Sequence, residues 1–279
     1  MNNLKLKAML EDFFIEDIGE GDLSSQALFK QSDKGVFHFI AKENGIFCGS
    51  EVIKAGFSII DNAIQVDVKK QDGDEVQIGE VIAIISGPMA GLLQGERVVL
   101  NLVQRMSGIA TTTMETVGIV EGTGVRICDT RKTTPGLRML EKYAVTCGGG
   151  YNHRKGLYDA VMLKDNHISF AGGITNAVKS VKEKLGHTVK IEVEIESKQQ
   201  MLEAIEAGAD IIMFDNRTPE EISEWISYVP SHVVTEASGG ITPKNVKEYG
   251  NTGVQYISLG YLTHSYKSLD ISAKVLMTT

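Results

Sequence analysis

The chain has 279 residues, enough for one large α/β domain or for two domains with real cores. Its net charge of −8 argues against non-specific nucleic-acid binding, which needs a basic face. No apolar run approaches a membrane span, and the charged stretch from Met1 to Phe14 contains no signal-peptide core. We therefore expect a soluble, cytoplasmic protein that binds neither nucleic acid nor membranes.

The cysteines give the same indication about the compartment. Cys48, Cys128 and Cys147 are odd in number and form no Cys-x-x-Cys pair. This pattern argues against a disulfide framework or a zinc site and favours a reducing compartment.

The first half of the chain predicts a mixed α/β unit. Helices are expected at Leu4–Ile15 and Ser50–Ile60, a loop at Gly19–Ser25, and strands at Val36–Ala41, Ile46–Cys48, Ile64–Val68 and Val81–Ile85. The Asp72-Gly73-Asp74 turn predicts antiparallel pairing of the last two strands. A long helical pattern runs from Gly91 to about Val120, with a break expected near Gly108.

From residue 125 onward the rhythm changes to alternating strands and helices. Strands are expected at Val125–Cys128, Ala160–Leu163, Val189–Val193, Ile211–Phe214, Val233–Thr235 and Tyr256–Leu259. Helices are expected at Leu137–Thr146, Ile174–Leu185, Lys198–Ala207, Pro219–Tyr228 and Pro243–Tyr249. Repeated β-α units of this length predict a parallel sheet, either open or closed as a barrel.

Polar residues follow successive strands, and their positions decide between an open sheet and a barrel. They are Asp129 and Arg131, Lys164, Glu194, Asp215, Glu236 with Ser238, and Gly260. A barrel gathers the carboxyl ends of all its strands at one mouth, whereas an open sheet concentrates its site at one switch point. Six strands are fewer than the usual eight, so we expect an incomplete barrel.

Cations and glycines are concentrated around these strand ends. From Glu96 to Asp165 the chain has ten basic and seven acidic residues, a local charge of +3 in an acidic protein. Arg131, Arg154 and Lys164, with His153, fit a dicarboxylate, because each guanidinium can bind one carboxylate through two hydrogen bonds. The alternatives are salt bridges to Asp129, Glu141 or Asp165, and a Schiff base on Lys164.

Two further groups suit a phosphorylated substrate. Glu194 and Asp215 end neighbouring strands and could hold Mg²⁺ directly or through water, although they could instead cap the following helices. Residues 238–242 lead from a strand into an expected helix and could bind phosphate, although an ordinary tight turn is the alternative. Gly260 allows a second close backbone approach.

At these residues the chain resembles the quinolinate phosphoribosyltransferase family, the carboxylating nicotinate-nucleotide pyrophosphorylases. The resemblance runs nearly end to end, and Phe214, where the family often has leucine, is a small apolar departure. The motifs that carry it are Glu16–Asp22, Glu96-Arg97 with Leu100–Leu102, Ser107–Thr111, Asp129–Arg138, Gly148–Gly156, Lys164–His167, Glu192–Glu194, Asp215-Asn216, Glu236–Ile241 and Leu262–Ser265.

The resemblance implies an N-terminal α/β sandwich domain at residues 1–107, to which the tail 270–279 returns. A six- or seven-stranded parallel α/β barrel would follow at residues 108–269. It implies the joining of quinolinate to 5-phosphoribosyl-1-pyrophosphate, with release of CO₂ and pyrophosphate, in de novo NAD biosynthesis. It also implies a homodimer with a shared active site.

The resemblance also assigns roles to single residues. Those implied for the quinolinate pocket are Arg131, His153, Arg154 and Lys164, with Arg97 supplied by the neighbouring subunit. Those implied for the phosphoribosyl donor are Lys132, Glu194 and Asp215 with Mg²⁺, and Ser238, Gly239, Gly240 and Gly260 for the 5-phosphate. Lys132, Lys164, Glu194 and Asp215 would be catalytic.

Three rival functions fit parts of the sequence. A paralogue encoded beside molybdate transporters would share the fold and take another acceptor. A Schiff-base aldolase would use Lys164. A carrier module would use the half-barrel-like segment 66–85, but its turn offers no lysine after Lys70 and the cationic cluster would remain unexplained.

Overall fold

The computed structural model describes residues 1–275, which divide into two compact units. The first unit contains Met1–Met114, Met139–Gly149 and the described residues from Tyr266 onward. The second contains Glu115–Arg138 and Gly150–Ser265. The segment Met139–Gly149 thus belongs to the first unit, whereas the predicted division places it in the second domain, residues 108–269.

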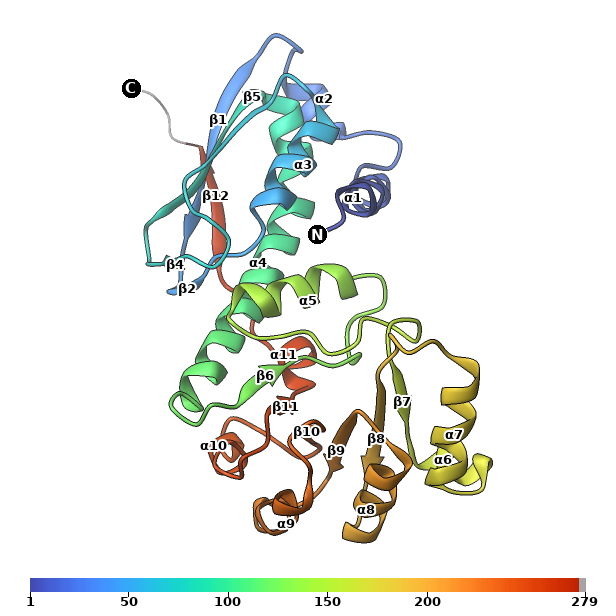
Figure 1. The fold of residues 1–279 in the computed structure, drawn as a ribbon. Helices are drawn as coiled ribbons and strands as arrows, with labels where there is room; N and C mark the ends of the chain where they lie inside the picture. The colour runs from blue at the N-terminus through green and yellow to red at the C-terminus, as the bar shows by residue number, and fades with distance from the viewer. Residues whose placement is uncertain (276–279) are drawn as a thin grey trace. The chain divides into compact units, whose positions relative to one another are not determined.

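The first unit is built on a four-stranded antiparallel sheet in the order β12-β1-β5-β3 (Figure 1). Its strands are β1 (Lys34–Ala41), β3 (Gln65–Val68), β5 (Val81–Pro88) and β12 (Ile271–Val275). β3 and β5 pair antiparallel, as the turn between them predicts. A small second sheet joins β2 (Gly45–Ile46) to β4 (Glu75–Val76). The predicted C-terminal tail contributes β12, while residues 276–279 lie outside the described part.

The first unit also contains helices, which with the sheet make the predicted α/β sandwich. They are α1 (Asn3–Ile18), α2 (Leu23–Leu28), α3 (Ser50–Ile60), α5 (Arg138–Cys147) and the long α4 (Met89–Ile119). α3 packs between α1 and β3, and the rings of Phe39 and Phe57 lie 6.0 Å apart in the core. The loop predicted at Gly19–Ser25 is wrong in its second half, because the Asp22 carboxylate accepts the Ser25 N–H and starts α2 there.

The helix α4 runs unbroken for 31 residues, so the break predicted near Gly108 is wrong. A Cβ at Gly108 would lie 2.2 Å from the carbonyl oxygen of Lys267, so this glycine permits a close backbone approach instead. Within residues 1–275, neither α4 nor any other helix combines the length and apolar character of a membrane span.

The second unit contains a six-stranded parallel sheet in the order β6-β11-β10-β9-β8-β7. The strands are β6 (Arg126–Cys128), β7 (Val161–Leu163), β8 (Ile191–Ile195), β9 (Ile211–Asp215), β10 (Val234–Ser238) and β11 (Tyr256–Ser258). β6 and β7 are consecutive in the chain yet form the two edges, and a closed barrel would pair them. The prediction of an incomplete parallel barrel is confirmed.

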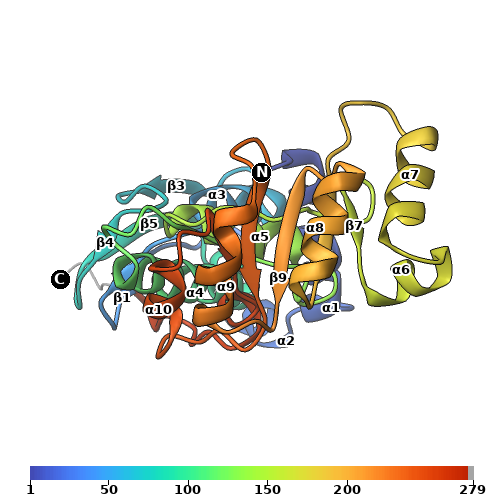
Figure 2. The same cartoon turned by 60° about the horizontal axis from the view of Figure 1, so that its bottom comes forward.

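The connecting helices lie between consecutive strands. They are α6 (Asp165–Ala171), α7 (Ile174–Lys184), α8 (Lys198–Ala207), α9 (Pro219–Trp225), the 3₁₀ helix η1 (Ile226–Tyr228), α10 (Val246–Gly250) and α11 (Tyr261–His264). α8 packs against β8 and β9 (Figure 2). The helix predicted from Pro243 begins only at Val246, because the Asn245 carboxamide accepts the Thr242 N–H at 2.7 Å and closes a turn first.

Two alanine substitutions within α4 test the close approach at Gly108. We expect Gly108→Ala to lower the free energy of unfolding by about 2–3 kcal/mol, because the new methyl group overlaps the Lys267 backbone. Gly118→Ala is the matched control, since no atom of residues 1–275 lies within 4 Å of its Cβ position. Its free energy of unfolding should rise by about 0.5–1 kcal/mol, because alanine has the higher helix propensity. Urea unfolding measures both, and equal effects would contradict the assignment.

Candidate functional site

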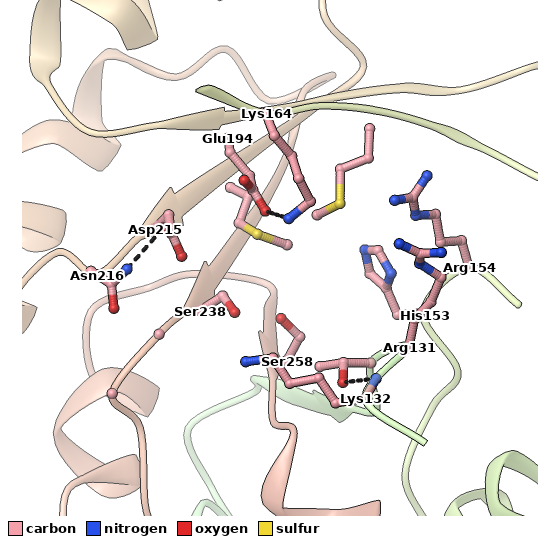
Figure 3. Close-up of a pocket in the computed structure, with 15 residues that line it drawn as sticks. Arg131, Lys132, His153, Arg154, Lys164, Glu194, Asp215, Asn216, Ser238 and Ser258 are labelled. Carbon is pink, nitrogen blue, oxygen red and sulfur yellow. Dashed lines mark hydrogen bonds and ion pairs between the residues drawn. The ribbon is translucent and has the colours of Figure 1, made fainter. Parts of the chain in front are cut away.

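A cavity of about 560 Å³ opens where the strands of the second unit end (Figure 3). It is lined by Thr130, Arg131, Lys132, His153, Arg154, Met162, Lys164, Glu194, Met213, Asp215, Asn216, Ser238, Gly239, Gly240 and Ser258. These residues come from the carboxyl ends of all six strands and from the segment beside β6. The cavity is therefore the barrel mouth that the strand-end pattern predicts.

Most of the predicted site residues meet in this cavity. Those that line it are Arg131, Lys132, His153, Arg154, Lys164, Glu194, Asp215, Ser238, Gly239 and Gly240. Gly260 lies beside Lys132, because a Cβ there would be 2.9 Å from the lysine Cδ. Arg97 does not line the cavity; it is an exposed residue of α4 in the first unit.

Arg131 and Arg154 bring their guanidinium groups close together at one side of the cavity (Figure 3). Within residues 1–275 neither guanidinium forms an ion pair. Arg154 Nη1 donates to the Ala160 carbonyl at 3.3 Å, while its buried Nε has no partner in this part of the chain. Burial and then the charge of Arg131 lower the pKa of Arg154. The pair thus presents positive charge to the cavity that an anion can neutralise.

Asp129 and Glu141, two of the three acidic residues considered as salt-bridge partners for these arginines, bond elsewhere. Buried Asp129 accepts the His153 backbone N–H at 2.9 Å and the Asn152 side-chain amide at 2.7 Å. Buried Glu141 pairs with Arg105 within the first unit. Asp129 therefore acts as a framework residue that fixes the segment leading to Arg154.

The opposite side of the cavity carries two carboxylates on adjacent strands. Glu194 on β8 forms an ion pair with Lys164, and burial raises its pKa although Lys164 opposes the shift. Asp215 on β9 accepts the Asn216 side-chain amide at 2.8 Å. Both carboxylates point into the cavity (Figure 3). Their oxygens suit a hard divalent cation that takes its other ligands from water or phosphate.

Helix capping, the alternative role for these two carboxylates, falls to other residues. The Ser197 hydroxyl accepts the Gln200 N–H at the start of α8. Thr218 and Glu221 form a capping box at the start of α9, which also has proline in its first turn. Glu194 and Asp215 are therefore free of a capping role.

A backbone turn at Asn216 and Gly239 shapes the third side of the cavity. Asn216 has a φ of 52°, and its N–H donates to the Ser238 carbonyl at 2.9 Å. A Cβ at Gly239 would lie 2.2 Å from Asn216 Oδ1, and Gly239 itself has a φ of +88°. At Gly240, with a φ of +63°, no atom of the described residues lies within 4 Å of the Cβ position. The two glycines allow the tight turn and leave room for a ligand against the backbone.

A buried acidic layer lies beneath the cavity. His153 Nε2 lies 2.9 Å from Glu192 Oε2 and 3.8 Å from Glu236 Oε1, and both glutamates are buried. Burial, together with the charge of Glu192, raises the pKa of Glu236 to about 7. The strand-end pattern predicts Glu236 at the mouth beside Ser238, but the structure buries it beneath the cavity, outside the lining. No role is predicted for Glu192, Met162, Met213 or Ser258. The alternation of side chains along each strand is the signal that could have placed the two glutamates. Glu192 precedes Glu194 by two residues and Glu236 precedes Ser238 by two, so each shares a face with a residue of the cavity lining.

Comparison with protein families matches nearly the whole chain. Residues 22–107 match the quinolinate phosphoribosyl transferase N-terminal domain, and residues 109–274 match the C-terminal domain of the same enzymes.

Individual relatives agree with this match. A probable carboxylating nicotinate-nucleotide pyrophosphorylase of Bacillus subtilis is 55% identical over 278 residues, covering 100% of this chain and 96% of the relative. The chloroplastic enzyme of rice is 41% identical over 97% of this chain and 77% of its own. The structure of NadC from Streptococcus pyogenes superposes with a TM-score of 0.94 at 37% identity, covering 99% of both chains. The structure of the nicotinate-nucleotide pyrophosphorylase from Francisella tularensis also superposes with a TM-score of 0.94. It is 35% identical and covers 99% of this chain and 98% of its own.

The raised pKa of Glu236 predicts a pH-dependent effect of Glu236→Gln. Between pH 4.5, its ordinary value, and about 7, the folded protein holds a proton that the unfolded chain has lost. The free energy of unfolding of the wild type should therefore fall through this window, while the amide does not titrate. Relative to wild type, the variant should gain about 2–3 kcal/mol between pH 5 and pH 8. Urea unfolding at both pH values measures this, and a pH-independent difference would refute it.

Proposed function

The chain belongs to the quinolinate phosphoribosyltransferase family, and we propose that the cavity of its second unit is the active site. The protein is a decarboxylating pentosyltransferase of NAD biosynthesis. It joins quinolinate to 5-phosphoribosyl-1-pyrophosphate and forms nicotinate mononucleotide, pyrophosphate and CO₂. Family membership decides against the Schiff-base aldolase and the carrier module. The observation that supports the location is the pair of guanidiniums, which form no ion pair within residues 1–275 and face two carboxylates across one cavity.

The cationic side of the cavity would bind quinolinate. The two carboxylates of this pyridine are on neighbouring carbons, so two adjacent guanidiniums can each take one through paired hydrogen bonds. Arg131 and Arg154 supply these forks, and His153 lies beside them. Lys164 adds a third positive charge, shared with Glu194 until the substrate arrives. This clamp would hold the ring nitrogen toward the ribose site.

The acidic side would bind the phosphoribosyl donor with Mg²⁺. Glu194 and Asp215 would hold the ion, whose role is to neutralise the departing pyrophosphate. Lys132 would add a positive charge to the same leaving group. Ser238 and the backbone of Gly239 and Gly240 would bind the 5-phosphate, with Gly260 leaving space beside Lys132.

Two chemical steps follow from this placement. As the bond to pyrophosphate breaks, positive charge develops on the ribose, and the clamped pyridine nitrogen attacks the anomeric carbon. Holding the two reactants together in this way can contribute roughly 7–11 kcal/mol at best. Loss of the 2-carboxylate as CO₂ then leaves an electron pair on carbon beside the pyridinium nitrogen, until a proton replaces it. Arg131 and Lys164 lie where their positive charges would stabilise that electron pair.

A homodimer would complete the site with Arg97 of the partner subunit. Within one chain Arg97 is exposed and absent from the cavity, so a second copy is the remaining source of its charge. The second unit also exposes large apolar side chains, with Leu157 at 75%, Tyr158 at 85% and Phe170 at 93%, as an interface would require. We also infer a cytoplasmic enzyme, because none of the three cysteines forms a disulfide within the described part of the chain.

Removing one guanidinium tests the clamp. Arg154→Ala should lower kcat/KM for quinolinate by at least about 100-fold, because one carboxylate loses its fork and Arg131 cannot hold both. Lys164→Ala should also lose quinolinate binding and turnover. The matched control is Arg126→Ala, since Arg126 is exposed and stacks on Tyr151 and Tyr256 away from the cavity lining. Calorimetric titration measures quinolinate binding, and a turnover assay measures kcat/KM. A wild-type affinity and a wild-type kcat/KM in Arg154→Ala would exclude the clamp.

Mixing two inactive variants tests the shared site. Each site would take Arg154 from one subunit and Arg97 from the other, so Arg97→Ala and Arg154→Ala would damage a site through different subunits. Co-expressed 1:1, half of the dimers should pair the two variants, and each mixed dimer would contain one intact site. Activity should therefore return to about 25% of wild type. Mixed dimers that are isolated by two affinity tags and stay inactive would rule out a contribution of Arg97 from the partner.

A further inference from the structure

Two cysteines that lie 99 positions apart in the sequence meet in the first unit, and neither lines the cavity. The Sγ atoms of Cys48 and Cys147 and a carboxylate oxygen of Asp72 all lie within 4.8 Å of one another. Cys48 is fully buried, whereas Cys147 is partly exposed at the end of α5. The mechanism proposed above uses neither thiol.

Hydrogen bonds hold the surroundings of the two thiols in place. The Cys48 backbone N–H donates to the Ser107 hydroxyl at 3.0 Å, and that hydroxyl donates back to the Cys48 carbonyl at 3.2 Å. Asp72 Oδ1 accepts the N–H groups of Gly49 and Ser50 at 2.9 and 2.8 Å. The Tyr143 hydroxyl donates to Asp72 Oδ2 at 2.7 Å. Both oxygens of Asp72 are thus engaged, which favours chemistry between the thiols over coordination of a metal ion.

The two thiols differ in the way that suits a reactive and a resolving cysteine. A hydrogen bond with Cys48 lowers the pKa of Cys147, outweighing burial and the charge of Asp72, which oppose it. The same contact and burial raise the pKa of Cys48. A cysteine with a lowered pKa, some exposure and a neighbouring thiol is the arrangement that responds to peroxide.

We propose that Cys147 and Cys48 form a reversible oxidation site that reacts with hydrogen peroxide. The Cys147 thiol first releases its proton to solvent, and the thiolate attacks one peroxide oxygen. The O–O bond breaks, Cys147 sulfenic acid forms, and the departing hydroxide takes up a proton from solvent to become water. The Cys48 thiol then loses its proton and attacks the Cys147 sulfur, releasing a second water and forming the disulfide. Two thiols lose one electron each and peroxide gains two, so the products are one disulfide and two waters. A dithiol reductant reverses the reaction.

This inference does not depend on the proposed function, because it concerns the thiols alone. In a reducing compartment disulfides are usually transient and redox-sensing, which agrees with two thiols poised for oxidation and free in the reduced chain. The disulfide would tie the end of α5 to the segment before α3, both in the first unit.

The test treats the reduced, folded full-length protein with hydrogen peroxide, blocks remaining thiols and maps peptides by mass spectrometry. Wild type and Cys128→Ala should both yield the Cys48–Cys147 cross-linked peptide, which disappears with dithiothreitol. Cys128 is the matched control because it is buried in β6 of the second unit. Cys48→Ala should stop at the sulfenic acid, which dimedone captures on Cys147, and Cys147→Ala should give neither product.

The outcome in wild type decides the proposal even if a variant fails to fold. Before oxidation, Cys147 should react with an alkylating agent at least about tenfold faster than Cys48 or Cys128. Folded wild-type protein that forms no cross-link with excess peroxide would overturn the proposal. So would a cross-link that appears only after unfolding in urea, or oxidation of Cys128 as fast as that of Cys147.

Discussion

The positive charge shared by Arg131 and Arg154 is the constraint on which the rest of the site depends. Two guanidiniums side by side repel each other, and the burial of Arg154 adds to that cost, so the fold must hold them in place. The barrel does this without pairing either guanidinium with a carboxylate of the residues that the structure describes. Asp129 binds the backbone and side chain of the neighbouring segment instead of the guanidiniums, and its burial keeps it out of the cavity. A substrate with two carboxylates can offset both the repulsion between the arginines and the cost of burying Arg154, and this gain contributes to its binding.

The negative charges are arranged in two layers along the same strands. The upper layer, with Glu194 and Asp215, faces the cavity and suits a divalent cation. The lower layer, with Glu192 and Glu236, lies buried beneath His153, where the raised pKa of Glu236 allows it to remain protonated near neutral pH. A protonated glutamate limits the negative charge below the site, so the cationic side still attracts an anion. The alternation of side chains along a strand places one layer directly below the other.

Much of this arrangement could be predicted from the sequence, because β-α units and polar strand ends are local patterns. Arg131, Lys164, Glu194 and Asp215 each follow a recognisable strand, so their meeting at one mouth follows from parallel topology. The lower layer escaped prediction, because the strand-end pattern places Glu236 at the mouth with Ser238 and gives Glu192 no position, whereas the structure buries both. The unbroken course of α4 also escaped prediction, because the backbone that Gly108 approaches lies near residue 267. The meeting of Cys48 with Cys147 was not predicted either, because 99 positions separate them. Contacts between distant segments depend on tertiary packing, which local patterns do not specify.

The most direct test of the central claim is the acceptor specificity of the wild-type enzyme with phosphoribosyl pyrophosphate and Mg²⁺. Quinolinate has two carboxylates and nicotinate has one, so the comparison removes one partner of the arginine pair without changing the protein. We expect kcat/KM for quinolinate to exceed that for nicotinate by at least about 100-fold, and turnover to stop when EDTA removes the metal. Equal turnover of the two acids would contradict a clamp built on two guanidiniums.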